Sequence, residues 1–129
     1  MRVAKEKAAE SWKNTIQLYE EFLLAVHGTF LGPMISLIKN KLAENPLAQG
    51  LIAGQSLHTL TIAEVEDVGS GEGHPYVAVD MFRDGTFECR FVKGAPGKVI
   101  IRERCSEDAV EGIVLKLMNM LRKNAINSE

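Results

Sequence analysis

The feature that most constrains the fold is a pair of β-type segments joined by the dipeptide Asp84-Gly85. Residues 76–82 (Tyr-Val-Ala-Val-Asp-Met-Phe) and 87–91 (Phe-Glu-Cys-Arg-Phe) alternate in side-chain character and are rich in β-branched and aromatic residues. Asp-Gly is a dipeptide that commonly joins the two strands of a hairpin. This stretch therefore predicts an antiparallel hairpin.

The register of the hairpin follows from which side chains share a face. A two-residue turn would place the apolar side chains of the first strand on the same face as Glu88 and Arg90. A three-residue loop with Gly85 at positive φ instead pairs Phe82 with Thr86. A slip of one residue would turn every side chain over, so we choose this register. It places on one face Val77, Val79, Met81, Phe87, Cys89 and Phe91, and on the other Tyr76, Ala78, Asp80, Glu88 and Arg90.

Two further segments extend the predicted sheet. Residues 98–104 are apolar in their first half and charged in their second, which suits an edge strand. Residues 57–66 alternate so that Leu60 and Ile62 point inward. We therefore expect a four-stranded antiparallel meander, with strands at about 57–66, 75–82, 86–92 and 98–104.

Helical periodicity is present on both sides of the sheet-forming region. Apolar residues at three- and four-residue steps predict a long helix at about 5–27, and Pro33 suits the first turn of a helix at about 33–44. Asn45-Pro46 ends that helix and could cap a short one at 46–53. Acidic residues at the start and basic residues at the end predict a helix at about 107–124, packed on one sheet face. The chain, 1–129, is expected to form a single α+β domain.

Composition narrows the class of protein. With 46% hydrophobic and 25% charged residues and a net charge of −2, neither disorder nor a general attraction to nucleic acid or anionic membranes is expected. No apolar segment follows the first charges, so we expect no secretory leader, a cytoplasmic location and free thiols. The uncharged stretch 22–38 is short for a membrane span and contains Gly32-Pro33, so no membrane partner is expected.

Several residue groups are candidate chemical sites. Cys105 is the candidate reactive thiol, because it follows Arg104 and precedes a helix N-terminus. The histidines and cysteines lack the close paired spacings of a zinc site, so neither a metal nor a cofactor is expected. A basic patch could contact phosphates, but few exposed aromatic residues accompany it, so nucleic acid is not the expected partner. The patch consists of Arg90, Lys93, Lys98, Arg102 and Arg104.

The leading hypothesis is a non-enzymatic interaction protein. The predicted helices and sheet offer more apolar surface than one four-stranded sheet would cover, and such a surplus often marks a binding surface. We expect a homodimer formed through apolar helix faces, with Leu115, Met118 and Met120 of the last helix at the interface.

Two alternatives remain open at this point. The first is a small-molecule-binding protein or enzyme with an apolar pocket between sheet and helices. Its walls would be Trp12, Tyr19, Phe22, Met81 and Phe91, and the polar groups near its mouth would include His27, His58 or Asp80. The second is nucleic-acid contact through the basic hairpin, which would be sensitive to salt.

Overall fold

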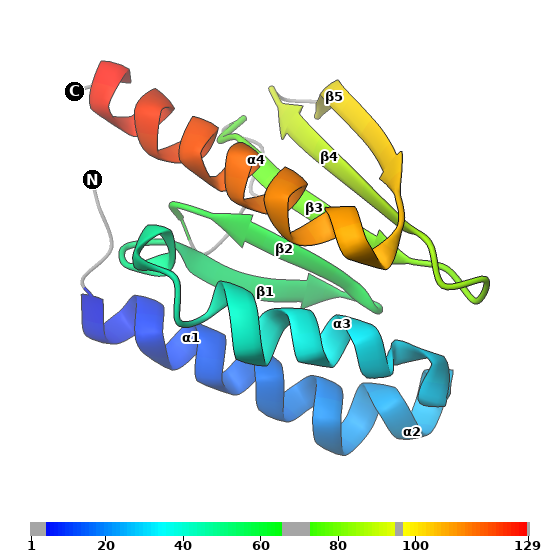
Figure 1. The fold of residues 1–129 in the computed structure, drawn as a ribbon. Coiled ribbons are helices and arrows are strands. Elements are labelled where there is room, and N and C mark those ends of the chain that lie inside the picture. Colours follow the sequence, from blue (N-terminus) through cyan, green and yellow to red (C-terminus); the bar gives the residue numbers. More distant parts are fainter. Residues whose placement is uncertain (1–4, 66–72, 95–96, 129) are drawn as a thin grey trace.

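A five-stranded antiparallel sheet with its helices on one face makes up the fold (Figure 1). The computed structural model describes residues 5–65, 73–94 and 97–128, without the side chains of His27 and of residues 124–128. One apolar cluster joins buried side chains of the helices to only one face of the sheet. The α+β class, with helices before and after an antiparallel sheet, is therefore confirmed.

The strands follow one another across the sheet as a meander. They are β1 (Ile52–Ser56), β2 (Thr59–Ala63), β3 (Tyr76–Met81), β4 (Phe87–Lys93) and β5 (Lys98–Cys105), in the order β1-β2-β3-β4-β5. This order is the expected one, because each strand pairs with its neighbour along the chain through a short connection or a single loop.

The predicted register of the β3–β4 hairpin is confirmed. Met81 pairs with Phe87, and the Phe82 N–H donates to the Thr86 carbonyl at 2.9 Å. Gly85 has a φ of 88°, the positive value that the three-residue loop requires. Hydrogen bonds from the side chain and backbone of Thr86 lower the pKa of the exposed Asp84 carboxyl group. The six side chains predicted to share the apolar face are all buried.

The sheet has five strands where four were predicted, and the predicted short helix at 46–53 is wrong. Only Pro46–Ala48 is helical, as the 3₁₀ turn η4, with Asn45 accepting a hydrogen bond from the Leu47 N–H at 3.0 Å. Gly50 then adopts a φ of 86°, which ends the turn. Residues from Ile52 onward enter β1 and pair with β2, so the predicted strand at 57–66 is the second half of a hairpin.

The two N-terminal helices have the predicted extents but are not uniform. The first consists of α1 (Lys5–Leu18), the π-helical turn η1 (Tyr19–Leu23) and α2 (Leu24–His27). The second follows the 3₁₀ turn η2 (Thr29–Leu31) and consists of α3 (Gly32–Leu37) and the π-helical turn η3 (Ile38–Leu42). The C-terminal helix α4 (Glu107–Ser128) contacts β3, β4 and β5 and is longer than predicted.

The wide apolar stripe of α4 is accounted for within the chain. Met118 and Leu121 are fully buried, and Leu115 and Met120 are partly buried against the core. One side of α4 packs on the sheet and another contacts η3 and η4. A helix packed against both a sheet and other helices needs a wider apolar surface than one that packs against a sheet alone.

Replacing Met118 by Ala should lower the free energy of unfolding by about 2–5 kcal/mol, since it removes a fully buried side chain and leaves a cavity. The matched change Met120→Ala, at a partly buried position of the same helix, should cost less than half as much. Urea unfolding followed by circular dichroism measures both. Equal losses in the two variants would contradict the packing of α4 described above.

Candidate functional site

Exposed apolar side chains gather at one end of the molecule, where three connections meet: the α2–η2 connection, the β1–β2 turn and the β3–β4 turn (right side of Figure 1). Among the side chains that the structure places, five large apolar ones are exposed, and four of them belong to these connections or to the end of the helix that leads into one of them. We call it the end surface. It consists of Phe22, Val26, Phe30, Leu57, His58, Phe82 and Arg83.

Leu57 is the least expected residue of the end surface. It lies in the two-residue turn between β1 and β2 and has a φ of 56°, the only positive φ of a non-glycine residue in the described part of the chain. Glycine, asparagine or aspartate normally takes such a position, and leucine there costs about 1–2 kcal/mol. Its side chain is 76% exposed, so packing within the chain does not offset this cost.

A shallow depression lies beside Leu57. It has a volume of about 150 Å³ and is lined by Phe30, His58, Met81, Phe82 and Arg83. The Phe30 ring meets the His58 imidazole edge to face, with centroids 6.2 Å apart, and the Arg83 guanidinium lies 4.8 Å from the Phe30 centroid. Pockets for small molecules usually enclose about 300–1,000 Å³, so this depression suits one side chain of a partner better than an enclosed ligand.

The first helix holds the β1–β2 hairpin in place. The Tyr19 hydroxyl donates to the His58 carbonyl at 2.7 Å, and the Trp12 indole N–H donates to the Leu51 carbonyl at 3.0 Å. Burial, and secondarily the nearby charge of Asp80, raises the pKa of Tyr19, so this hydroxyl stays protonated. The turn that contains Leu57 is thus held by a hydrogen bond from a buried side chain of the first helix to its backbone.

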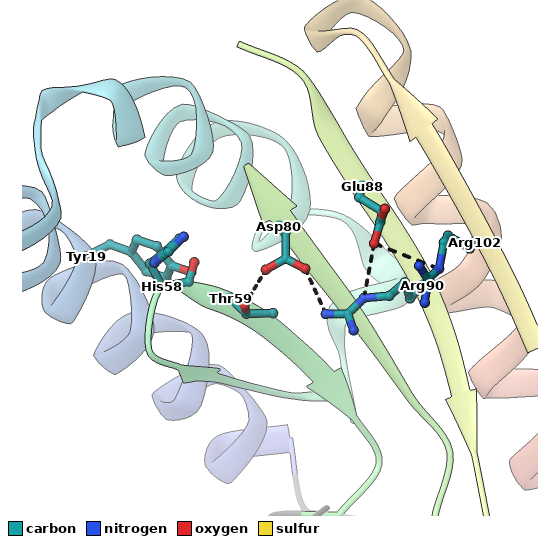
Figure 2. A network of polar contacts seen from close by, with 7 residues as sticks. All are labelled: Tyr19, His58, Thr59, Asp80, Glu88, Arg90 and Arg102. Carbon is teal, nitrogen blue, oxygen red and sulfur yellow. Dashed lines mark hydrogen bonds and ion pairs between the residues drawn. The ribbon is translucent and has the colours of Figure 1, made fainter. Parts of the chain in front are cut away.

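The sheet face opposite the helices carries a network of charges (Figure 2). Thr59 donates to one oxygen of Asp80, and the Arg90 guanidinium donates to the other at 2.7 Å. The Glu88 carboxylate lies 3.7 Å from Arg90 Nε and 4.0 Å from Arg102 Nε. Asp80 and Glu88 are directly opposite, as the register predicted, but each carboxylate is paired with an arginine. The arrangement is that of a structural charge network.

The residues predicted to line one apolar pocket lie in different places. His58 and Met81 line the depression, and Phe22 is exposed on the π-helical turn η1 of the first helix. Trp12, Tyr19 and Phe91 belong to the core cluster. The side chain of His27 lies outside the described residues. Sequence reasoning missed Phe30 and Leu57, because the Leu57-His58 link lacks the glycine, asparagine or aspartate that normally marks a two-residue turn.

The two thiols contact each other across β4 and β5. Cys89 is buried and Cys105 is partly buried, and both are free. Burial raises the pKa of Cys105. The hydrogen bond with Cys89 lowers this pKa by a smaller amount, and the nearby charge of Glu103 raises it further. The sequence led us to expect a lowered pKa, and the reason for the difference is burial. The environment of Cys105 therefore favours the thiol over the reactive thiolate.

Three further observations concern metal binding, membrane crossing and similarity to known proteins. Within the described residues, no three His, Cys, Asp or Glu side chains are grouped so that they could hold a metal ion. No helix in that part of the chain combines the length and the apolar character needed to cross a membrane. Comparisons with protein-family models, curated proteins and solved structures found no match.

Tyr19→Phe should lower the free energy of unfolding by about 1–3 kcal/mol, because it removes the hydrogen bond that the buried Tyr19 hydroxyl donates to the His58 carbonyl. The pKa of Tyr19 is higher in the folded than in the unfolded state, so its contribution is complete below the unfolded-state value and is lost as pH rises through the folded-state value. The free energy of unfolding of the variant should therefore fall less steeply than that of the parent protein as the pH rises in the alkaline range. Urea unfolding at neutral and alkaline pH tests both effects.

The matched control for this change is Tyr76→Phe, at a partly exposed position of β3. It should alter the stability at neutral pH by less than Tyr19→Phe does. Equal stability of the Tyr19 variant and the parent protein would show that the hydroxyl does not hold the β1–β2 turn.

Proposed function

We propose that this chain is a non-enzymatic interaction protein that self-associates through the end surface. The observation that carries the proposal is Leu57, a leucine at positive φ with a mostly exposed side chain. A residue that disfavours folding without making internal contacts is a candidate for a role outside the folded chain.

The distribution of exposed apolar side chains supports this proposal. Isolated exposed apolar residues are normal on a protein surface, but a gathering of them at one place is typical of binding sites. Phe22 is 56% exposed and Val26 59% exposed on the first helix, and Leu57 and Phe82 come from two separate turns. The self-association first expected through the last helix is thus proposed for a different surface.

A second copy of the chain is the occupant that the end surface favours. An interface with two-fold symmetry places a surface against itself, so it needs both a projection and a recess and charges of both signs. Leu57 projects beside a depression that could take one such side chain. The basic Arg83 lines the depression, the acidic Asp84 follows it in the β3–β4 turn, and the exposed Glu20 and Glu21 lie on the first helix.

A second candidate function, binding of a small apolar ligand, is favoured by a groove on the helices. The groove has a volume of about 340 Å³ and lies between α1 and the segment that contains η3. Trp12 and Ile16 line it, with Lys13 and Lys39 among its other walls. Its size is at the lower limit for a small-molecule site, and it is open along the surface. We rank this candidate below self-association.

Sedimentation equilibrium over the micromolar range tests the proposal. The parent protein should change from monomer to dimer as its concentration rises, and Leu57→Gly should raise the dissociation constant about tenfold or more, as expected for a central apolar residue. Glycine suits the φ of 56°, so folding stability should be unchanged or higher. Loss of association without loss of stability is the specific signature.

Ile100→Ser is the matched control, because Ile100 is also an exposed apolar residue (55%) but lies on β5, away from the end surface. It should leave the dissociation constant within about twofold of that of the parent. A parent protein that stays monomeric at all concentrations, or a Leu57→Gly variant that associates like the parent, would refute the proposal.

A further inference from the structure

The two edges of the sheet differ in how they are covered. At β1, the α1 helix packs along the strand, and the outward N–H of Ala53 donates to Ser11 Oγ at 2.9 Å. At the other edge, β5 is an eight-residue strand with no described helix or strand beyond it (Figure 1). An uncovered edge of this length can accept another strand.

The backbone groups that β5 offers can be identified from the register. Hydrogen-bonded pairing in the β3–β4 hairpin begins at Phe82, and such pairs alternate along an antiparallel ladder. Successive residues of β4 therefore direct their backbone hydrogen bonds alternately to β3 and to β5. Cys89, which pairs with Glu103, is one of those that bond to β5. The residues on either side of Glu103, which are Arg102 and Arg104, thus direct their N–H and C=O groups outward.

The side chains on the same edge are basic. Arg102 and Arg104 are more than half exposed, with side-chain exposures of 58% and 53%. Glu103 is on the opposite face of the sheet and lies 3.5 Å from Lys116. An incoming strand would therefore meet positive charge at each position where it pairs with an outward backbone group.

The cross-strand pairs of the β4–β5 hairpin place further basic residues next to this edge. Arg90 is directly opposite Arg102, and Lys93 is directly opposite Lys98. Like charges in this position destabilise a hairpin. Two carboxylates offset the first pair, because Asp80 accepts from Arg90 at 2.7 Å and Glu88 lies within 4.0 Å of both arginines.

We propose that β5 binds an extended acidic segment of a partner protein as a sixth strand of the sheet. The backbone of the segment pairs with Arg102 and Arg104, and acidic side chains at alternate positions of the segment lie beside the two guanidinium groups. Ile100, which is exposed, can contact an apolar side chain near one end of the same segment. Main-chain hydrogen bonds supply the affinity, and the alternating charges supply the specificity.

Other occupants fit this edge less well. A second β5 strand would bring the same basic residues against each other, so pairing between two copies is disfavoured. A nucleic acid would need several freely exposed rings for stacking, but the Arg104 guanidinium occupies one face of the Phe82 ring, 4.1 Å from its centroid, and Tyr76 is partly buried. A nucleic acid would also leave the outward N–H and C=O groups without strand partners.

Fluorescence anisotropy with a labelled peptide that alternates glutamate with valine tests the proposal. The peptide should bind with a salt-dependent affinity, and the same peptide N-methylated at alternate amides should bind at least about tenfold more weakly, since methylation blocks strand pairing. Arg102→Glu should weaken binding about tenfold or more. The charge-matched control Lys13→Glu, on α1, should change the affinity by less than about twofold.

Hydrogen exchange measured by NMR gives a second readout. Bound peptide should slow exchange of the Arg102 and Arg104 amides, which a purely electrostatic contact would not do. No binding up to millimolar peptide, equal binding of the N-methylated peptide, or unchanged exchange at these two amides would overturn the proposal. Binding of single-stranded oligothymidine at least as tight as that of the peptide would also overturn it and would assign the basic edge to nucleic acid.

Discussion

Burial of one face of the β3–β4 hairpin is the constraint on which the rest of the structure depends. Val77 and Val79 on β3 and Phe87 and Cys89 on β4 are fully buried, and the loop that ends at Gly85 fixes their common orientation. Once that face is apolar, helices must cover it, and the chain supplies them from both ends, with α4 over the middle strands and α1 along β1. The opposite face is then left for charged side chains, which the sequence places at alternate positions.

The sequence predicted those parts of the fold that depend on local pattern. Side-chain alternation and one glycine were enough for the hairpin register, and apolar spacing was enough for the three main helices. Strand β1 was missed because Ile52 and Ala53 continue the apolar pattern of the preceding turn, and only pairing with β2 and contact with Ser11 of α1 distinguish a strand from a helix there. Such contacts join residues far apart in the chain, so a local pattern does not contain them.

The candidate site was less accessible from sequence, because exposure is decided by tertiary packing. Tyr19 and Phe22 are both aromatic and lie three residues apart in the same helix, yet the first is fully buried and the second mostly exposed. Similarly, Met118 lies within the core although its helix had an apparent surplus of apolar residues. The basic edge was visible as a local excess of arginine and lysine. The position of β5 at a sheet edge was also predicted. Which of its backbone N–H and C=O groups point outward follows only from the pairing register of β4 with β5.

The π-helical turn η1 has a consequence for how this protein can vary. A π turn contains one residue more than the same length of α-helix needs, so it is equivalent to a single-residue insertion that the helix has absorbed. An extra residue in a regular α-helix would rotate everything after it by about 100°, but the wider π turn absorbs this rotation, so Val26 and the remainder of α2 face nearly as they would in a continuous helix. Loss of one residue at η1 would therefore leave a regular helix whose tip faces nearly the same way. A single-residue deletion at this point is thus a change that descendants of this chain could accept while keeping both the core and the apolar end in place.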